Sequence, residues 1–551
     1  MNFLCRAVSS LEKIFGEDPC IKGDTYKGGS ALQGEVYSFQ LAYRSEHWGP
    51  FWGKIEIESE LKEFITLREV AMAPAEHLAY DWLRADAVIK TTPGLYPDIL
   101  LPIGEKYKFP IRQSRSLWVT LEIPIDCKPG KYSVKFTFKH TEEMPPEEPE
   151  VFGECAVNIE VLDAKLPPQQ LIHTEWFHTD CLYSYYQVEC WSDEHWNLIS
   201  KYMKSAVKHG INMILTPLWT PPLDTAVGGE RPTVQLLEIS EKDGKYEFDF
   251  SRLAKWIEVA KRVGVEYFEM SHFFSQWGAK FSPKIIVNGE KRFFWHTEAL
   301  SDEYQDFLKQ LIPQLTAFLA GKNLQKQCYF HISDEPSLEM LDNYKDAAEL
   351  VTNLLGDLEA WPIIDALSSP EYYDMGIIKQ PIPGNNHLDA FYERQVKPLW
   401  TYYCVGQQSA VPNRFFNFPS SRNRIMGILM YRYGVDGFLQ WGFNFWYSQY
   451  SLDQHLDPFR VTDAGRAFCS GDSYMVYPGS EGPIDSLHYE VFREGLQDMR
   501  ALQGLERKIG REKVLAMLEE NLGYQLTMFE YPLEPGWLLE LRNRINHALA
   551  E

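Results

Sequence analysis

Hydrophobic and polar residues alternate with a period of two in the N-terminal third of the chain. The clearest stretches are 117–123, 132–138 and 155–161, where apolar side chains occupy every second position. A turn signal, Lys128-Pro129-Gly130, separates the first two stretches. Strands with one apolar and one polar face pack as antiparallel sheets that are buried on one side. The pattern therefore predicts an N-terminal antiparallel β-sandwich.

This N-terminal part ends near Pro167-Pro168, where the rhythm of the sequence changes. The acidic, proline-rich stretch 142–149 is typical of an exposed loop between two strands. No group of chemically active residues stands out before residue 168. We therefore expect a structural or accessory domain over 1–167 and a catalytic domain over 168–551.

Short apolar runs alternate with helical patterns after residue 168. Ser192 and Gly210 bound one predicted helix, Ser301 and Gly321 bound a second, and a third begins near Ser337. The strand-like runs between the helices are 171–177, 212–216, 265–270, 327–332, 360–364, 399–405 and 437–441, with a weaker one at 377–381.

These eight runs favour a (β/α)8 TIM-type barrel. The stretch 171–435 has about the length of such a barrel, which is typically ~250 residues. Parallel strands buried on both faces are continuously apolar, as these runs are. An open doubly wound sheet is the competing fold, but no glycine-rich phosphate turn follows the first run. Helices predicted around 512–521 and 537–550 form a C-terminal extension that closes the barrel or pairs with a second chain.

Charge and composition narrow the range of possible functions. The 551 residues contain 54 Lys plus Arg against 77 Asp plus Glu, a net charge of −23, which repels nucleic acid and anionic lipid. Aromatic residues make up 14%, which suits either a sugar-binding groove or simply large cores. No stretch approaches the length and hydrophobicity of a transmembrane helix, so we expect no membrane insertion.

The nine cysteines are scattered and form no CxxC pair, which argues against a zinc cluster or a disulfide framework. The N-terminus lacks a sustained apolar region followed by a small-residue cleavage site. As written, the sequence predicts a reduced, cytoplasmic protein.

Candidate chemistry lies where the run 327–332 ends. In a barrel, catalytic groups gather at the C-terminal ends of the strands, and Asp334 and Glu335 follow this run directly. Burial and mutual repulsion should raise at least one of their pKa values. One carboxylate before a helix is usually a cap, but Pro336 and Ser337 already provide the helix start. We therefore expect the pair to be functional.

Adjacent acids are an unusual arrangement for ordinary glycoside hydrolysis, because a retaining enzyme normally places its two carboxyl groups ~5 Å apart across the bond. Neighbouring acids more readily serve one side of a sugar. One can protonate the glycosidic oxygen while the other orients a nucleophile on the substrate itself. The 2-acetamido group of an N-acetylhexosamine can be that nucleophile.

Three segments resemble a known family. His331-Ile332-Ser333-Asp334-Glu335-Pro336 is similar to the catalytic signature of glycoside hydrolase family 123, the β-N-acetylgalactosaminidases. The stretch 437–446, with Asn444 and Trp446 after Gly437-Phe438-Leu439-Gln440-Trp441-Gly442, strengthens the resemblance. The tail 471–498 does so as well, and all three segments keep the order of the family.

The resemblance implies retaining, substrate-assisted removal of terminal β-N-acetylgalactosamine. Carried over by position, Glu335 is the general acid and then the base, and Asp334 accepts the acetamido N–H and stabilises the oxazolinium. A raised pKa of the acid fits this division, although protonation belongs to the coupled pair.

Other residues near strand ends are weaker candidates for sugar contacts, since each can equally be a core residue. Those predicted to bind substrate are Trp176, Trp277, His331, Tyr402, Tyr403, Trp441, Asn444 and Trp446. Less favoured are His272, Asp365, Asn386 and His387.

Other chemistries find little support. The sequence has no Gly-x-Ser-x-Gly elbow, phosphate loop or His-Glu-x-x-His helix. His173 and His178 flank the first run, but their spacing is nonspecific for metal. We expect no cofactor and no metal, and a glycan with a terminal β-N-acetylhexosamine as partner. A catalytically silent carbohydrate-binding barrel, or a hexosaminidase for another N-acetylhexosamine, remains an open alternative; oligomeric state is not predicted.

Overall fold

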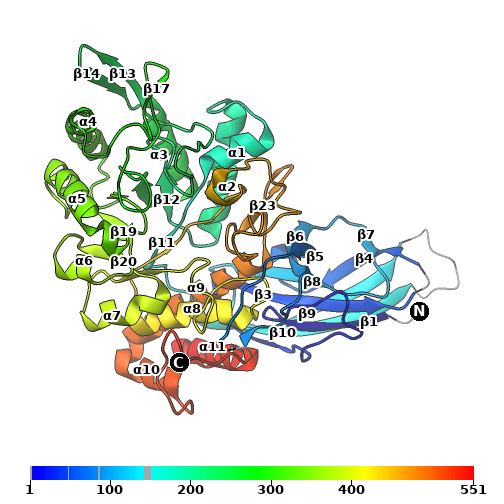
Figure 1. Cartoon of the computed structure of the whole chain (residues 1–551). Helices are drawn as coiled ribbons and strands as arrows, with labels where there is room; N and C mark the ends of the chain where they lie inside the picture. Colours follow the sequence, from blue (N-terminus) through cyan, green and yellow to red (C-terminus); the bar gives the residue numbers. More distant parts are fainter. Residues whose placement is uncertain (1–2, 48, 85–86, 142–149) are drawn as a thin grey trace.

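The computed structural model describes residues 3–47, 49–84, 87–141 and 150–551. The predicted loop 142–149 lies outside these ranges. Two parts are visible in Figure 1, with the N-terminal strands on one side and a mixed array of helices and strands on the other.

The N-terminal part consists of two five-stranded sheets with the orders β1-β3-β8-β5-β6 and β2-β10-β9-β4-β7. All pairings are antiparallel except that of β10 with β2. The predicted N-terminal antiparallel sheet domain is confirmed. The strands are β1 (Phe3–Ser9), β2 (Gly28–Gln33), β3 (Val36–Ser45), β4 (Phe51–Glu58), β5 (Ile65–Ala75), β6 (Gly94–Pro102), β7 (Tyr107–Phe109), β8 (Ser114–Glu122), β9 (Gly130–His140) and β10 (Val151–Lys165).

Alternating apolar residues fill the space between the two sheets, as the period of two predicts. Leu117, Val119 and Leu121 of β8 are completely buried in the same cluster as residues of β9 and β10. The other face of β8 is not exposed, however. Trp118 is also completely buried, and it belongs to the core of the C-terminal part. The C-terminal part covers the second face of this sheet, so β8 is buried on both faces instead of one.

The C-terminal part contains parallel strands. Six of them pair in the order β18-β15-β12-β11-β22-β21, and β19 pairs separately with β20. Single parallel bridges, Phe330 with Ile363 and Gly384 with Tyr402, lie on the two sides of this pair. The strands are β11 (Ile172–Glu175), β12 (Met213–Thr216), β15 (Tyr267–Met270), β18 (Cys328–Tyr329), β19 (Ile364–Ala366), β20 (Gln380–Ile382), β21 (Trp400–Tyr402) and β22 (Gly437–Gln440).

Every predicted strand-like run overlaps one of these strands. The continuous hydrogen-bonded ladder covers six strands only, so the structure shows a parallel half-barrel with a neighbouring two-stranded pair rather than one regular eight-stranded ladder. Short strands that continue as irregular segments, such as the two-residue β18, account for the interruption.

The predicted helices are present. Ser192 caps α2 by accepting a hydrogen bond from the backbone N–H of His195 at 3.2 Å. Ser301 precedes α4, but its hydroxyl donates to the carbonyl of Glu298. The helices are α1 (Thr179–Tyr186), α2 (Asp193–Lys208), α3 (Ser251–Val263), α4 (Asp302–Gly321), α5 (Leu341–Leu355), α6 (Glu371–Asp374), α7 (Leu388–Glu393), α8 (Ser420–Tyr433), α9 (Leu487–Ile509), α10 (Arg511–Glu519) and α11 (Pro535–Ala550).

Three antiparallel hairpins were not predicted, because they lie inside the connections between strands and helices. They are β13 (Glu238–Lys242) with β14 (Lys245–Asp249), β16 (Ile285–Val287) with β17 (Glu290–Phe293), and β23 (Val476–Gly479) with β24 (Gly482–Asp485).

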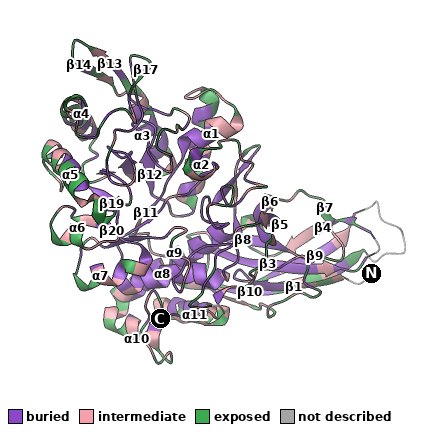
Figure 2. Cartoon of the chain, viewed as in Figure 1, coloured by how far each residue is buried: buried purple, intermediate pink, exposed green. Residues whose placement is uncertain are grey.

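The C-terminal helices join the two parts of the molecule. Helix α11 packs against α9 and against β2 and β10 of the sandwich, and Figure 1 shows these helices beside both parts. Helix α11 therefore covers the sandwich edge within the same chain, and pairing of this extension with a second chain stays a prediction. Figure 2 shows buried residues running from the sandwich strands into α8 and α9.

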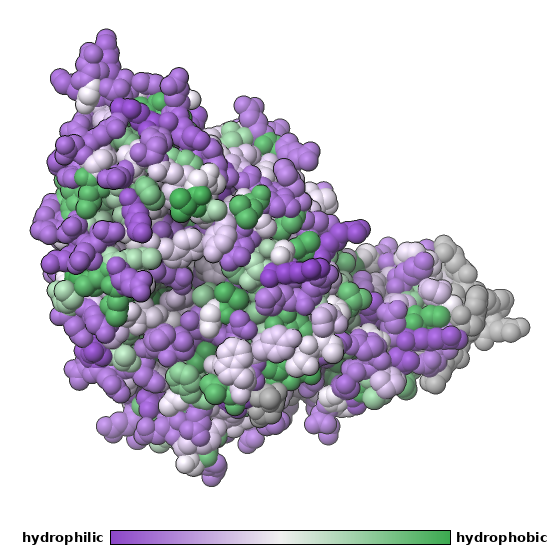
Figure 3. All heavy atoms as spheres, viewed as in Figure 1, coloured by the Kyte–Doolittle hydropathy of each residue, from purple (hydrophilic) through white to green (hydrophobic). Residues whose placement is uncertain are grey.

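The surface is mainly polar. On the face seen in Figure 3, hydrophilic residues cover most of the molecule and hydrophobic residues form small separate patches. Within the described ranges, no helix combines the length and the apolar character needed to span a membrane.

Candidate active site

The acid pair is carried by a segment that is hydrogen-bonded on both sides. On one side, the N–H groups of Phe273 and Trp277 donate to the carbonyls of His331 and Asp334 at 3.1 and 3.0 Å. On the other, the N–H of Glu335 donates to the carbonyl of Ala366 at 3.0 Å. The segment is therefore held like a sheet strand although it continues beyond β18.

Asp334 and Glu335 open into a pocket at the C-terminal ends of the parallel strands. A larger hollow of about 690 Å³ lies beside Trp191 and the β13–β14 hairpin, but it is remote from these acids, so chemistry rather than size identifies the site. The pocket is lined by Trp176, His178, Leu223, Asp224, Gln276, Trp277, Asp334, Glu335, Ala366, Tyr402, Cys404, Val405, Leu439, Trp441, Gln449, Tyr450 and Phe468.

Asp334 is the buried member of the pair, with 4% of its surface exposed. Gln276 donates from Nε2 to Asp334 Oδ2 at 2.8 Å, and the carbonyl oxygen of the Gln276 side chain accepts the N–H of Asp224 at 2.6 Å. Burial and the neighbouring Glu335 raise the pKa of Asp334 well above its usual range. The fixed orientation leaves Oδ1 of Asp334 for a ligand.

Glu335 is the exposed member, and its backbone has a left-handed φ of 43°. Such a φ is uncommon for a residue other than glycine, and it marks the sharp turn between the strand extension and the following helix. Tyr402 donates from its hydroxyl to Glu335 Oε1 at 2.7 Å. The pocket walls shield the carboxyl from water and raise the pKa of Glu335, while the bond from Tyr402 opposes this effect.

Aromatic side chains form the walls of the pocket. Trp176, Trp277 and Trp441 all line it, as the sequence predicts. Trp441 donates from Nε1 to Asp472 Oδ2 at 3.0 Å, and its ring meets Phe468 edge-on at 4.9 Å. Indole faces beside two carboxyl groups suit a ligand with apolar C–H faces and polar edges, such as a sugar ring.

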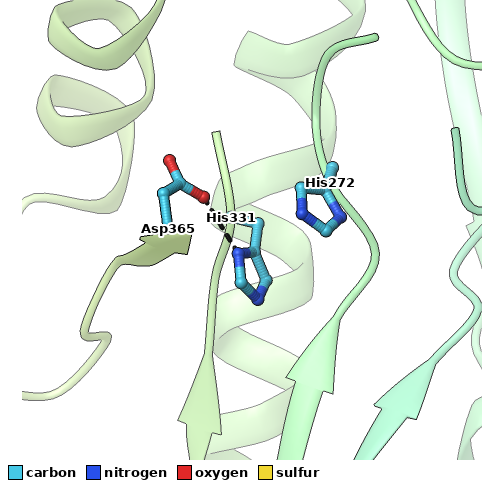
Figure 4. Close-up of side chains that lie close together, drawn as sticks. All are labelled: His272, His331 and Asp365. Carbon is cyan, nitrogen blue, oxygen red and sulfur yellow. Dashed lines mark hydrogen bonds and ion pairs between the residues drawn. The ribbon is translucent and has the colours of Figure 1, made fainter. Parts of the chain in front are cut away.

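A buried ion cluster lies behind the acid pair. His331 is placed between Glu269, with Nε2 to Oε1 at 2.7 Å, and Asp365, with Nδ1 to Oδ1 at 2.9 Å. Figure 4 shows His331 turned toward Asp365 of β19, with His272 beside it. All of these side chains are 0–1% exposed.

Four residues predicted to contact the sugar do not line this pocket: His331, Tyr403, Asn444 and Trp446. His331 is occupied by the ion cluster. Tyr403 points into the core against Phe438 and Phe492, as expected for a residue next to the pocket residue Tyr402 on a strand. Asn444 instead bonds both backbone groups of His178, and Trp446 is buried with its Nε1 on the carbonyl of Val476.

The weaker candidates also lie elsewhere. His272 and Asp365 are buried behind the acids, Asn386 accepts a hydrogen bond from Gln407, and His387 is exposed outside the pocket. His173 lies in the core, 3.4 Å from Glu175.

His178 does line the pocket, but burial and Arg231 lower its pKa to about 3. Arg231 donates to its Nδ1. In the described part of the chain, the groups with metal-ligand spacing are His272, His331 and Asp365, and His209, Asp485 and Glu490. Neither group includes the histidines that flank the first strand.

Several pocket residues were missed by sequence reasoning. Gln276 precedes the predicted Trp277, and Cys404 lies two residues after Tyr402, so proximity to these residues was a usable signal. Asp224, Tyr450 and Phe468 come from long connections without hydrophobic periodicity, and no pattern marks them.

Comparison with known proteins gives one family. The model of the glycoside hydrolase 123 catalytic domain matches residues 176–505. A comparison with curated proteins gave no match.

A solved family 123 glycoside hydrolase from Clostridium perfringens, studied for glycolipid glycan hydrolysis, is 16% identical over 100% of this chain and 98% of that one, with a TM-score of 0.76. A Bifidobacterium dentium β-glucuronidase is 9% identical over 85% and 63% of the two chains, with a TM-score of 0.34. A putative β-galactosidase from Bacteroides fragilis is 8% identical over 88% and 60%, with a TM-score of 0.31. The first of these shows a shared fold along the whole chain.

Proposed function

Because this chain belongs to glycoside hydrolase family 123 and is a glycosidase, we propose that it removes terminal β-N-acetylgalactosamine with retention, using the 2-acetamido group of the substrate as nucleophile. The observation that carries this proposal is the adjacent pair Asp334 and Glu335, one buried and fixed, the other open to an indole-lined pocket. The two acids lie on one segment, which suits a mechanism in which both serve the same side of the sugar.

In the first step, the acetamido carbonyl oxygen forms a bond to C1 as the bond from C1 to the glycosidic oxygen breaks. Glu335 gives its proton to that leaving oxygen. Asp334, ionised, accepts the acetamido N–H through its open oxygen and stabilises the positive charge of the oxazolinium.

In the second step, a water oxygen attacks C1 from the opposite face, the oxazoline C–O bond breaks, and Glu335 takes the proton. Two inversions at C1 give overall retention. Tyr402, which bonds only one oxygen of Glu335, leaves the other free to carry the transferred proton.

The Clostridium perfringens relative, studied for glycolipid glycan hydrolysis, supports a glycan as the substrate, and the choice of N-acetylgalactosamine as its terminal sugar rests on the resemblance of residues 331–336 to the family signature. We also infer that the eight parallel strands act as one (β/α)8 barrel. Their order along the chain and the single bridges on both sides of β19 and β20 support this closure. We retain the division near Pro167-Pro168 as a proposal: the last sandwich strand ends at Lys165 and the first parallel strand begins at Ile172.

The test is a panel of nitrophenyl β-glycosides of N-acetylgalactosamine, N-acetylglucosamine and galactose, with a thiazoline that mimics the oxazoline as inhibitor. We expect turnover only with the 2-acetamido group present and strong inhibition by the thiazoline. Equal turnover of galactoside and N-acetylgalactosaminide contradicts the mechanism. Binding of N-acetylgalactosamine without turnover of any aryl glycoside favours a silent binding protein, and preference for the gluco sugar favours a different hexosaminidase.

Asp334→Asn separates the two roles. We expect a large loss of kcat on the aryl glycoside and a much smaller loss on the preformed oxazoline, because the second substrate needs no orientation of the amide. Equal losses on both substrates remove the proposed role of Asp334.

A further inference from the structure

The buried histidine cluster, defined as Glu269, His331 and Asp365, lies directly behind the acid pair. It joins three neighbouring strand ends, those of β15, β18 and β19. All three side chains are 0% exposed, which is costly for charged groups unless they compensate one another. Because its burial is costly, we expect this cluster to have a role beyond packing.

Both ring nitrogens of His331 face carboxylate oxygens at hydrogen-bond distance. A neutral imidazole has one N–H, so it would set a lone pair against one of these oxygens. With both nitrogens protonated, the ring donates twice. Burial lowers the pKa of His331, but the bonds to Asp365 and Glu269 outweigh it and raise that pKa to about 9.

The two carboxylates of the cluster also hold the surrounding structure. Asp365 accepts the N–H groups of Ile332 at 3.1 Å and Ser333 at 3.4 Å, which are the peptides immediately before Asp334. Glu269 accepts Nε1 of Trp176, a wall of the pocket, at 2.7 Å. The ring of His331 thus links the segment that carries the acids to an aromatic wall.

His331 also matters for the charge of Asp334. Burial, Glu335 and Asp365 raise the pKa of Asp334, whereas the positive charge of His331 and the bond from Gln276 lower it. Tyr402 and Cys404 face the same pair, and their own pKa values are raised by burial, so they remain neutral. His331 is the cation among these groups.

We propose that His331 is a positioning residue of the catalytic centre: its doubly protonated ring, held between Glu269 and Asp365, fixes the segment that carries the acid pair and favours the ionised form of Asp334 beside Glu335. The inference rests on the proposed function, since that is where an ionised Asp334 is needed. It assigns no contact between His331 and the sugar.

A metal ion is the alternative occupant, because atoms of His272, His331 and Asp365 lie within 4.8 Å of one another. Two observations disfavour it. Both nitrogens of His331 already face carboxylates, and the rings of His272 and His331 stack at 4.1 Å with 22° between their planes. Lone pairs of nearly parallel rings do not converge on one ion. Burial and the charge of His331 lower the pKa of His272, which keeps that ring neutral.

The test compares His331→Gln with Tyr344→Phe. The second variant removes the hydrogen bond that the uncharged Tyr344 hydroxyl donates to Asp365, and it leaves the histidine in place. Carboxyl-labelled aspartate is titrated by NMR, and the resonance missing in Asp334→Asn identifies Asp334. We expect the midpoint of Asp334 to rise by about one pH unit or more in His331→Gln, as for loss of a nearby opposite charge, and to stay unchanged in Tyr344→Phe.

Kinetics give the second readout. In His331→Gln, the acidic limb of kcat/KM should move to higher pH by the same amount, with kcat falling more than KM changes. If His331→Gln does not fold, His331→Asn removes the same charge, and it should shift the midpoint in the same direction.

An unchanged Asp334 midpoint in a folded variant overturns the inference, as does one tightly bound metal ion per chain that is lost in His331→Gln. The NMR titration needs no turnover, so it decides this inference even if no aryl hexosaminide is cleaved. Cleavage with an unshifted midpoint refutes the role of His331 and leaves the proposed function intact.

Discussion

Two groups of carboxylates in this molecule differ in whether arginine side chains lie beside them. The arginine cluster, defined as Arg68, Arg424, Arg542, Glu490 and Asp498, lies where the sandwich meets the C-terminal part. Arg424 bonds both oxygens of Asp498 at 2.7 and 3.0 Å, and Arg542 adds a third bond at 2.7 Å. Each carboxylate there meets at least one guanidinium.

The pKa values of the carboxyl groups depend on whether an arginine lies beside them. Burial favours protonation of Glu490, yet Arg493 and Arg68 hold its pKa well below the usual range. Glu494 is intermediate, because burial raises its pKa to about 7 in spite of Arg424. At the acid pair, Asp334 and Glu335 have no guanidinium partner, and both pKa values are raised.

The difference teaches which buried acids serve stability and which serve chemistry. Glu490, paired with two guanidinium groups, stays ionised and anchors two surfaces, whereas Glu335, without such a partner, keeps a proton that it can transfer. Three substitutions test whether this division holds.

The largest effect is expected for Glu335→Gln, which removes the general acid. We expect kcat on a nitrophenyl N-acetylgalactosaminide to fall about 10²- to 10⁴-fold, with Tm unchanged or higher because a desolvated acid is gone. Steady-state kinetics and calorimetry on the same preparation measure both. An unaltered kcat would falsify the assignment, and a large loss of Tm would place Glu335 with the arginine cluster.

Arg424→Leu should lower stability and leave activity unchanged, the reverse of Glu335→Gln. Loss of the arginine leaves Asp498 and Glu494 buried without this partner, so the free energy of unfolding should fall by about 3–5 kcal/mol. Activity per folded molecule should not change, because the residue is remote from the pocket. Denaturant unfolding and active-site titration check the two parts, and a stable variant with impaired turnover would erase the contrast.

The smallest effect is expected for Asp224→Asn in the pocket wall. Burial raises the pKa of Asp224 to about 6, above the value of ~3.9 for an unfolded chain. The folded state therefore binds this proton more tightly, and stability falls as pH rises from about 4 to 6, then stays level. Asparagine tolerates the φ of 40° and still accepts the N–H of Tyr450.

The free energy of unfolding of Asp224→Asn should thus exceed that of the unmodified protein by about 1–3 kcal/mol at pH 8 and should equal it at pH 4. Urea unfolding at the two pH values measures the difference. A gain of the same size at both pH values would mean that packing rather than ionisation is responsible.

The sequence predicted those features that depend on hydrophobic periodicity and on the positions where strands end. The antiparallel sheets, the overlap of every strand-like run with a parallel strand, and the place of Asp334 and Glu335 all follow from patterns of a few residues. The ring of Trp441 was also placed correctly, since it follows a buried strand. Local patterns carry this information because they reflect local geometry.

Other features depend on contacts between distant segments. Tyr402 and Tyr403 are neighbours in sequence, but only Tyr402 faces the pocket, and the pleat decides which. His331 is part of the family-like signature, yet its partners Glu269 and Asp365 come from other strands. The contact of Gln276 with Asp334 joins a loop to a strand extension. Only the folded chain brings these groups together.

The shared core around Trp118 has a consequence for how the molecule melts. Apolar residues of β5, β6 and β8 belong to the same cluster as those of α2 and α9, so the boundary proposed near Pro167-Pro168 does not divide the interior. Removing the sandwich would expose to solvent the apolar residues of α2 and α9 that belong to this shared cluster. We therefore expect the two halves to unfold as one cooperative unit on heating, and we expect this sandwich, grafted onto another hydrolase, to be an incomplete fold.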